Sequence, residues 1–429
     1  MTPADPTTAP NPAAPNPTAP NPTAPNPAGS DSAVPNPLTD LTLEELRRRT
    51  SVKWQRFGPD VLPLWVAEMD VRPAPAVMEA LTAALRAGDT GYPHGRGYAR
   101  AFADFARNRW GWADLDVEHT AQVTDVMTGI TEVLRVLSDP GDAVVVTSPV
   151  YPPFFEFPER IGRTVLEAPL TAEGRLDPTT LADALDRARR HGPRPVLLLA
   201  NPHNPTGTVH TRAELEQAVT LARQAGARVV ADEIHAPLVH GPVPFTPLLT
   251  AAGAEDAVVV TSAAKGWNLP GLKAALVIAG PEATTVGDLP YEAQQGASHL
   301  AILAHTVALT SGREWLDALL PALADNQRLL RKLLAEHLPQ VRYRPGEATY
   351  LAWLDCSALG LPGPADGGHH VRDMDGPARF FLEEAQVALN AGHTFGGGGE
   401  QCVRLNYATR PEILTEAVQR MGEAVRRRG

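Results

Sequence analysis

The sequence predicts an α/β fold in which a largely parallel sheet is covered by helices on both faces. Short apolar runs rich in valine recur along the chain, and stretches with helical periodicity lie between several of them. Strands that are apolar along their whole length are buried on both faces, and an intervening helix makes successive strands parallel. The expected strands are 143–147, 196–200, 228–231, 257–261 and 274–279. The expected helices are 128–138 before the first strand, and 178–190 and 211–225 between later ones.

Further elements are expected on both sides of this alternating region. The capping box Thr42-Leu-Glu-Glu45 predicts a short helix through Arg49. A proline at its start and Gly88 just past its end predict a helix over 75–87. The other expected elements are helices at 98–110, within 291–337, at 377–384 and at 411–427, strands at 350–354 and 402–406, and a surface loop at 362–377. The mixture near the C-terminus predicts a smaller α+β domain.

Residues 1–37 have a different composition and are predicted to be a disordered Pro/Asn/Ala-rich tail. The unit Ala-Pro-Asn-Pro recurs there with a period of five, and 12 of the 42 prolines of the chain lie in this stretch. The stretch contains no Leu, Ile, Phe, Tyr or Trp. Such a segment cannot bury enough apolar surface to offset the entropy lost on ordering, so we expect a polyproline-II-like extension.

The composition excludes several classes of protein. Two cysteines in 429 residues cannot form a disulfide scaffold, so we expect a reducing compartment, the cytoplasm. The apolar runs are too short for a membrane helix, and the N-terminus lacks the pattern of a secretory signal. A net charge of -11 argues against nucleic acid or an anionic membrane as partner. Histidine spacing indicates no metal site: Pro237 separates His235 from His240, and His369-His370 lies in the predicted loop.

Chemically distinctive side chains follow the expected strands. After these strands come, in chain order, Tyr151, Asn204, Asp232, His235 and Lys265. In an open α/β sheet, ligands bind at the carboxyl ends of the strands, so these side chains are expected at one edge. Lysine is rare in this chain, with 4 lysines against 34 arginines. The set describes a pocket for a flat, anionic, aromatic cofactor that bonds covalently to a lysine amine.

Pyridoxal phosphate (PLP) meets each of these requirements. Its aldehyde needs an amine, and its ring nitrogen needs a carboxylate to stay protonated. Its phosphate needs the N–H groups of a helix N-terminus, which the segment Val126-Met127-Thr128-Gly129 supplies. Ser262 and Lys273 add a hydroxyl and a positive charge.

Seven motifs carry a resemblance to a known family. They are Leu64-Trp-Val-Ala-Glu-Met-Asp70, Gly91-Tyr-Pro-His-Gly-Arg-Gly-Tyr98, Pro149-Val-Tyr-Pro-Pro-Phe154, Asn201-Pro-His-Asn-Pro-Thr-Gly207, Ala231-Asp-Glu-Ile-His235, Ser262-Ala-Ala-Lys-Gly-Trp-Asn-Leu269 and Val403-Arg-Leu-Asn406. In these motifs the chain resembles the fold-type I PLP enzymes of the aspartate aminotransferase-like superfamily. Within that superfamily it resembles the MalY/PatB-type cystathionine β-lyases, or C–S lyases. The resemblance leaves out only the tail.

The resemblance implies a role for each residue that matches a motif. Lys265 would bond to the cofactor and, once released by substrate, act as base on the Cα proton. Asp232 would face the ring nitrogen, and Asn204 would bond the phenolic oxygen of the ring. Tyr151 would stack on the ring, and His235 stands where this branch has histidine. Met127, Thr128, Ser262 and Lys273 would contribute to phosphate binding.

Two further residues would bind substrate or reach the cofactor from a second subunit. The resemblance implies that Arg404 clamps the substrate carboxylate, and that Tyr92 reaches the phosphate of the neighbouring subunit. The active site would then be shared across a homodimer. The chain also departs from the family pattern: Lys273 stands where arginine is common, Ala264 where a hydroxyl residue is common, and Glu68 where aspartate is common.

The resemblance also implies the domain organisation and the activity. A large PLP-binding domain with a mostly parallel, seven-stranded type of sheet would span 76–310, and 311–429 would form the small α+β domain together with 38–75. The implied activity is cleavage of L-cystathionine or a related cysteine S-conjugate to a thiol, pyruvate and ammonia. Two alternatives stay open: a class I/II aminotransferase on the same fold, and a PLP-binding regulator of a transcription factor.

Overall fold

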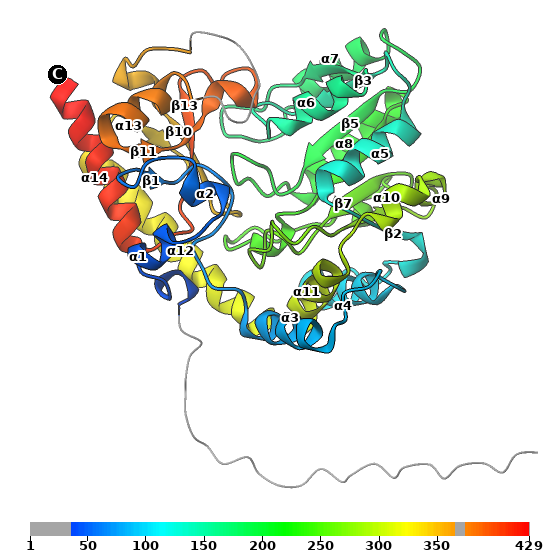
Figure 1. The fold of residues 1–429 in the computed structure, drawn as a ribbon. Helices are drawn as coiled ribbons and strands as arrows, with labels where there is room; N and C mark the ends of the chain where they lie inside the picture. The colour runs from blue at the N-terminus through cyan, green and yellow to red at the C-terminus, as the bar shows by residue number, and fades with distance from the viewer. Residues whose placement is uncertain (1–35, 365–373, 429) are drawn as a thin grey trace, which may run out of the picture. The chain divides into compact units, whose positions relative to one another are not determined.

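A computed structural model describes residues 36–364 and 374–428 of the chain (Figure 1). Among these residues, seven strands form one sheet in the order β2-β8-β7-β6-β5-β3-β4. The strands are β2 (Thr120–Val123), β3 (Ala143–Val146), β4 (Thr164–Glu167), β5 (Val196–Ala200), β6 (Arg228–Asp232), β7 (Val258–Thr261) and β8 (Ala275–Ala279). The four pairings from β4 to β7 are parallel. The predicted α/β class with a mostly parallel sheet is therefore confirmed.

Strand β8 runs antiparallel to both of its neighbours, β2 and β7. The chain between β7 and β8 consists of turns rather than a helix. A parallel pairing needs a long crossover, usually helical, whereas a shorter connection returns the chain in the opposite direction. The apolar run of β8 alone could not distinguish the two directions.

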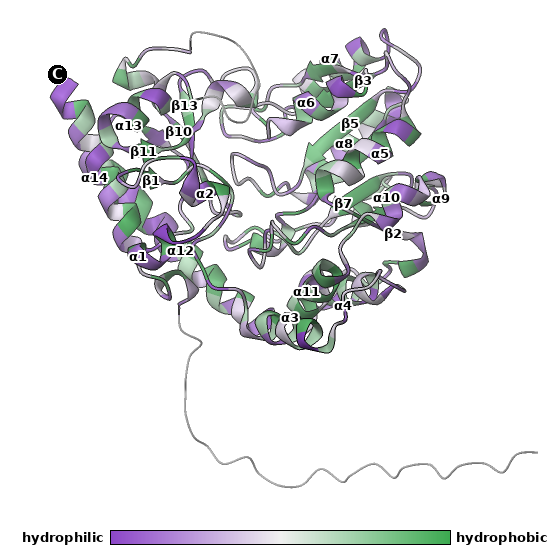
Figure 2. Ribbon diagram, viewed as in Figure 1, coloured by the Kyte–Doolittle hydropathy of each residue, from purple (hydrophilic) through white to green (hydrophobic). Residues whose placement is uncertain are grey.

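Alternate residues of the strands face two separate apolar cores. Val144 and Val146 of β3 belong to one core, with α5 (Val126–Leu137) and α6 (Pro153–Arg160). Ala143 and Val145 belong to the other core, with α7 (Pro178–Ala188) and α8 (Arg212–Gln224). Helices on both faces explain why the strands are apolar throughout, and Figure 2 shows β5 and β7 mainly in the colour of apolar residues.

A second group of strands joins the two ends of the described chain. Sheet β12-β13-β10-β9 is antiparallel and consists of Asn390–Ala391, Cys402–Asn406, Leu351–Asp355 and Arg342–Tyr343. The short strand β1 (Leu62–Pro63) pairs in parallel with β11 (Val387–Ala388). Helices α13 (Pro377–Ala385) and α14 (Pro411–Arg428) pack with these strands, and α12 (Arg313–His337) packs on α14. The N-terminal segment thus lies with the C-terminal third, while the exact domain boundaries stay a prediction.

Of the remaining helices, the first two precede β1, and the others lie on the two connections between these groups of strands. They are α1 (Leu43–Arg47), α2 (Val52–Gln55), α3 (Pro75–Ala87), α4 (Gly97–Trp110), α9 (Thr285–Asp288), α10 (Tyr291–Gln295) and α11 (His299–Thr310). Helices α3, α4 and α11 pack together, and Figure 1 shows them as one cluster. None of the helices in the described part of the chain is long and apolar enough to cross a membrane.

The structure corrects three sequence-based expectations. The folded part includes Asn36 and Pro37, assigned above to the tail: the Asn36 side chain accepts from the Leu38 N–H at 2.9 Å, and Pro37 is buried. Helix α5 begins at Val126, not at 128, because Asp125 caps it by accepting from the Thr128 N–H. Helix α6, which the sequence did not predict, starts with Pro153 in its first turn. The rest of the tail, and His369-His370, lie outside the described residues.

Replacing Gly129 with alanine is expected to destabilise the fold. A Cβ atom on Gly129 of α5 would lie 2.9 Å from Val123 Cγ2 and 3.0 Å from Val260 Cγ1. Overpacking a buried helix–sheet contact typically costs about 1–3 kcal/mol. We expect the Gly129→Ala variant to lose roughly this much free energy of unfolding in chemical denaturation.

The matched control is Gly287→Ala in α9, where a Cβ atom would meet no atom within 4 Å. That substitution is expected to leave the stability unchanged or slightly raised. Equal stability of the two variants would mean that α5 does not pack on β2 and β7 as closely as described.

Candidate active site

A cavity of about 300 Å³ lies at the carboxyl end of the parallel strands. Strands β5, β6 and β7 are neighbours in the sheet, so the residues that follow them meet there. The predicted site residues on the cavity wall are Met127, Thr128, Tyr151, Asn204, Asp232, His235, Ser262, Lys265 and Lys273. The structure therefore brings together nine side chains that are dispersed over the sequence.

The amine of Lys265 lies in this cavity and donates to a main-chain carbonyl. Its Nζ is 2.7 Å from the carbonyl oxygen of Ala67. Burial lowers the pKa of Lys265 to about 8, and the positive charges of Arg404 and Lys273 act in the same direction. The negative charges of Asp232 and Glu68 oppose this shift. An amine with such a pKa is partly neutral near pH 7 and is therefore a competent nucleophile and base.

Asp232 and His235 are buried polar side chains that make few hydrogen bonds within the protein. Asp232 accepts from the Ile234 N–H at 3.0 Å, and burial raises its pKa to about 7. The Nδ1 atom of His235 is buried without a hydrogen-bond partner. Burial, followed by the charges of Lys265 and Arg404, lowers the pKa of His235 well below its ordinary value, so its ring is neutral. A cationic ring nitrogen beside Asp232 would restore the ionised carboxylate.

Arg404 does not line the cavity wall but is tied to it through Asn204. Its guanidinium donates to Asn204 Oδ1 at 3.1 Å, to Asn390 Oδ1 at 2.6 Å and to the carbonyl of Trp65 at 3.3 Å. Burial lowers the pKa of Arg404 to about 10, and its Nε is buried without a partner. Arg404 therefore keeps a positive charge and a free donor next to Asn204.

The start of α5 forms a second part of the cavity wall. Asp125 caps the helix by accepting from the Thr128 N–H at 2.8 Å, and its other oxygen lies 3.2 Å from Lys273 Nζ. The N–H groups of Val126 and Met127 have no acceptor within the helix, because no helix carbonyl precedes its first turn. This end of α5 combines N–H donors, the helix dipole and Lys273, which suits a phosphate. The hydroxyl of Ser262 donates to the carbonyl of Ala274 at 2.7 Å, so in this structure its proton is used within the protein.

Two aromatic residues predicted for the site have different positions. Tyr151 lines the cavity, and its ring packs edge-on against Phe154. Tyr92, on the connection between α3 and α4, is 92% exposed and is not part of the cavity wall of its own chain. A role for Tyr92 in its own site thus has no support in the described chain, and a role in a second subunit stays a prediction.

The sequence analysis missed several residues that support the site. The segment Trp65–Asp70 passes the cavity, and its backbone carbonyls accept from Lys265, Arg404 and Asn406. The motif in this segment was noted, but a backbone acceptor leaves no signal in a sequence. Glu233 was missed as well: its Oε1 accepts from Asn201 Nδ2 at 3.0 Å and from the Leu248 N–H at 2.8 Å, behind the cavity wall.

Comparisons with known proteins agree with this geometry. The family described as aminotransferase class I and II matches residues 59–421. A Mycobacterium leprae protein named "putative cystathionine beta-lyase" is 54% identical over 91% of this chain and 98% of its own length. The cystathionine beta-lyase PatB of Bacillus subtilis is 31% identical over 89% of this chain and 98% of its own.

A solved structure extends this similarity to the fold. The crystal structure of a "putative plp-dependent beta-cystathionase" from Corynebacterium diphtheriae superposes with a TM-score of 0.80 and 33% identity, covering 90% of this chain and 98% of that one. The resemblance to fold-type I enzymes of the PatB type is confirmed.

The titration of Glu233 is expected to make the stability pH-dependent. Burial raises the pKa of Glu233 to about 8, and the charge of Asp232 adds to the shift. Between about pH 4.5 and pH 8 the folded chain then keeps a proton that the unfolded chain has released, so the free energy of unfolding falls as pH rises through this window. Glu233→Gln keeps the carbonyl acceptor but does not titrate. We compare the melting temperature of this variant with that of the unsubstituted chain at two pH values. The difference is expected to shift in favour of the variant by roughly 2–4 °C from pH 5.5 to pH 8.5.

Glu423→Gln on α14 serves as the control, because Glu423 is solvent-exposed. It should follow the unsubstituted chain at both pH values. A Glu233→Gln difference that is the same at both pH values would mean that Glu233 is already ionised in the folded protein.

Proposed function

Because the chain belongs to the aminotransferase class I and II family, we propose that it is a PLP-dependent carbon–sulfur β-lyase. Its substrate would be L-cystathionine or a related cysteine S-conjugate, and its products a thiol, pyruvate and ammonia. We propose a lyase rather than an aminotransferase because the relatives reported above are named as cystathionine beta-lyases. The observation that carries the proposal is the cavity in which the Lys265 amine, with its lowered pKa, shares a wall with Asp232, Asn204 and the start of α5.

The residues of the cavity fit PLP. Lys265 would hold the aldehyde carbon, Asp232 the ring nitrogen and Asn204 the phenolic oxygen. The α5 N-terminus and Lys273 would hold the phosphate. The fit is supported by polar groups that the protein leaves unsatisfied, such as Nδ1 of His235, and by the raised pKa of Asp232. When bound, PLP supplies an aldehyde that bonds to amines and a ring that accepts the electrons released at Cα.

The side chains of the protein divide the remaining work. Arg404 would bind the substrate carboxylate, because it is buried and charged and keeps its Nε–H free. Lys265, once its amine is free, would take the Cα proton, which its lowered pKa favours. The carbonyl of Ala67 holds that amine in place. Loss of a thiolate from Cβ then requires no second substrate, which separates a lyase from an aminotransferase.

The first test is the reaction itself. The PLP-loaded protein is expected to release pyruvate and a free thiol from L-cystathionine in equal amounts, without any 2-oxo acid present. Lys265→Ala removes the amine and is expected to lower turnover by at least about a thousandfold. Both products are assayed in the same sample.

The same assay separates the two chemistries. Amino transfer from L-aspartate or L-alanine to 2-oxoglutarate is expected to be slow. Turnover that depends on 2-oxoglutarate and releases no thiol would contradict the lyase and identify an aminotransferase. It would leave the assignments of PLP and Lys265 intact.

We further propose that the active enzyme is a homodimer with shared active sites. Large apolar side chains are exposed on α3 and on the segment that follows it: Met78, Leu85 and Tyr92 are 49%, 58% and 92% exposed. Exposed apolar residues grouped in this way are typical of contact surfaces. In the proposed dimer a second copy would cover them, and Tyr92 of one subunit would reach the phosphate site of the other.

Subunit mixing tests this arrangement. If Tyr92 acts on the partner subunit, Tyr92→Phe and Lys265→Ala proteins are each expected to be nearly inactive. A mixed dimer then has one site with both natural residues, so activity should return to roughly a quarter of normal after full exchange of equal amounts. Exchange is verified with two differently tagged chains. Verified exchange without any return of activity would show that Tyr92 does not act across the interface.

A further inference from the structure

The segment Trp65–Asp70, called the strap below, supplies the acceptor for the catalytic amine. The carbonyl oxygen of Ala67 accepts from Lys265 Nζ at 2.7 Å and from the Tyr350 hydroxyl at 3.0 Å. The N–H of Glu68 donates to the carbonyl of Val66 at 2.8 Å, which closes a tight turn centred on Ala67. The peptide group between Ala67 and Glu68 is therefore held at both its N–H and its carbonyl.

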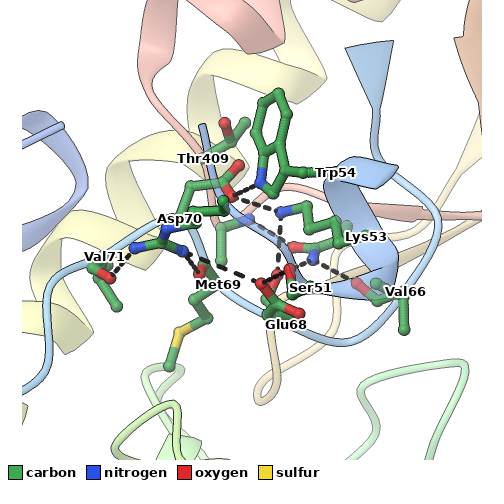
Figure 3. A network of polar contacts seen from close by, with 12 residues as sticks. Ser51, Lys53, Trp54, Val66, Glu68, Met69, Asp70, Val71 and Thr409 are labelled. Carbon is green, nitrogen blue, oxygen red and sulfur yellow. Dashed lines mark hydrogen bonds and ion pairs between the residues drawn. The ribbon is translucent and has the colours of Figure 1, made fainter. Parts of the chain in front are cut away.

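Lys53 holds the next carbonyl of the strap. Its Nζ lies 2.9 Å from the carbonyl oxygen of Glu68 and 2.9 Å from Asp70 Oδ1. Both Lys53 and Asp70 are completely buried. The indole N–H of Trp54 donates to the same Asp70 oxygen at 3.0 Å. Figure 3 shows Lys53 and Trp54 converging on Asp70 beside Glu68.

Two asparagines hold other peptide groups of the strap. Asn406 Nδ2 donates to the carbonyls of Val66 and Glu68 at 2.7 and 2.8 Å, on either side of Ala67. Asn268, three residues after Lys265, exchanges two hydrogen bonds with Met69. Lys53 and Asn406 thus meet at the Glu68 carbonyl, one peptide away from the acceptor of the amine.

Stability alone does not explain a buried ion pair at this place. Removing two charges from water costs several kcal/mol each, and well-packed apolar residues often replace such a pair without loss. Asp70 Oδ2, moreover, is buried without a hydrogen-bond partner. The pair does fix an orientation: Lys53 Nζ is held between one oxygen of Asp70 and the Glu68 carbonyl, and this contact orients that carbonyl.

We propose that Lys53, fixed by Asp70, is a positioning residue that orients the Ala67 carbonyl toward the amine of Lys265. This inference rests on the proposed function, in which the Lys265 amine alternates between a form bonded to PLP and a free form. Whenever that amine is free, a fixed acceptor keeps it near one position and favours its protonated form. Lys53 itself touches neither substrate nor cofactor.

The charged groups that influence the pKa of Lys265 remain in the protein when the Lys53–Asp70 pair is replaced. Arg404 of β13, Lys273 before β8, Asp232 of β6 and Glu68 of the strap influence the pKa of Lys265, and Lys265 in turn influences that of His235. A change in the protonation of Lys265 after substitution at position 53 would therefore report on the Ala67 acceptor and on Glu68.

The test replaces the pair by neutral residues. In Lys53→Met/Asp70→Asn both charges are gone, while the new amide oxygen keeps an acceptor for Trp54. We expect the melting temperature to change by no more than roughly 3 °C, KM for L-cystathionine by less than about twofold, and kcat to fall at least about tenfold.

The cofactor-free protein captures added PLP through the neutral Lys265 amine, which visible absorbance follows. The pH midpoint of capture should move down by about half a unit or more, because a lost acceptor destabilises the ammonium form.

Two controls separate positioning from general loosening. Trp54→Phe removes a donor to Asp70 without touching a carbonyl of the strap, and should lower the melting temperature while leaving kcat and the capture midpoint unchanged. Lys332→Met makes the same lysine substitution at an exposed position of α12 and should change nothing. If the double variant does not fold, Lys53→Arg keeps the charge on a differently shaped group that cannot reproduce both 2.9 Å contacts, and its kcat and midpoint should fall.

A folded variant of the pair with unchanged kcat and an unchanged capture midpoint would overturn the positioning role. The same result for Lys53→Arg would overturn it if only that variant folds. Failure of the unsubstituted protein to capture PLP at Lys265, or to cleave cystathionine, would instead contradict the proposed function. The two failures are therefore distinguishable.

Discussion

The hydrogen bond between the Lys265 amine and the Ala67 carbonyl joins the two halves of the site. Lys265 follows strand β7 of the large sheet, while Ala67 belongs to the strap that leads away from β1. A main-chain carbonyl cannot titrate or rotate freely, so it is a stable acceptor for an amine that changes its protonation. The strap in turn is held by side chains from α2 and β13, and by Asn268. The placement of one amine thus depends on contacts from four regions of the chain.

Burial sets the protonation of the site. It lowers the pKa of Lys265 to about 8 and that of Arg404 to about 10, and raises that of Asp232 to about 7. The largest cause of each shift is the same, the loss of water around a charge. Strongly shifted pKa values of this kind are typical of functional sites. Arg404 keeps its charge in spite of burial, which suits a group that binds an anion.

Much of the site could be predicted from the sequence, because it follows from the rule for strand ends. Asp232 ends strand β6 and Lys265 follows β7 after three residues. Strands β5 to β7 are neighbours, so their carboxyl ends had to meet. The strap lies within one of the seven motifs, but the role of its backbone leaves no comparable signal. Its function lies in backbone carbonyls, which every residue has, and Lys53 precedes it on a four-residue helix with no neighbouring motif.

The sequence by itself determined the α/β class, the place of the lysine, and the family. These depend on local patterns: apolar runs, helix caps and the residues that follow strands. Only the tertiary structure decided that β8 runs antiparallel, that Glu233 and Asn201 support the cavity wall, and that Lys53 is buried against Asp70. The physical reason is that such contacts join residues far apart in the chain. Their energies depend on burial and on direction, and neither is a property of a single residue or of its neighbours in the sequence.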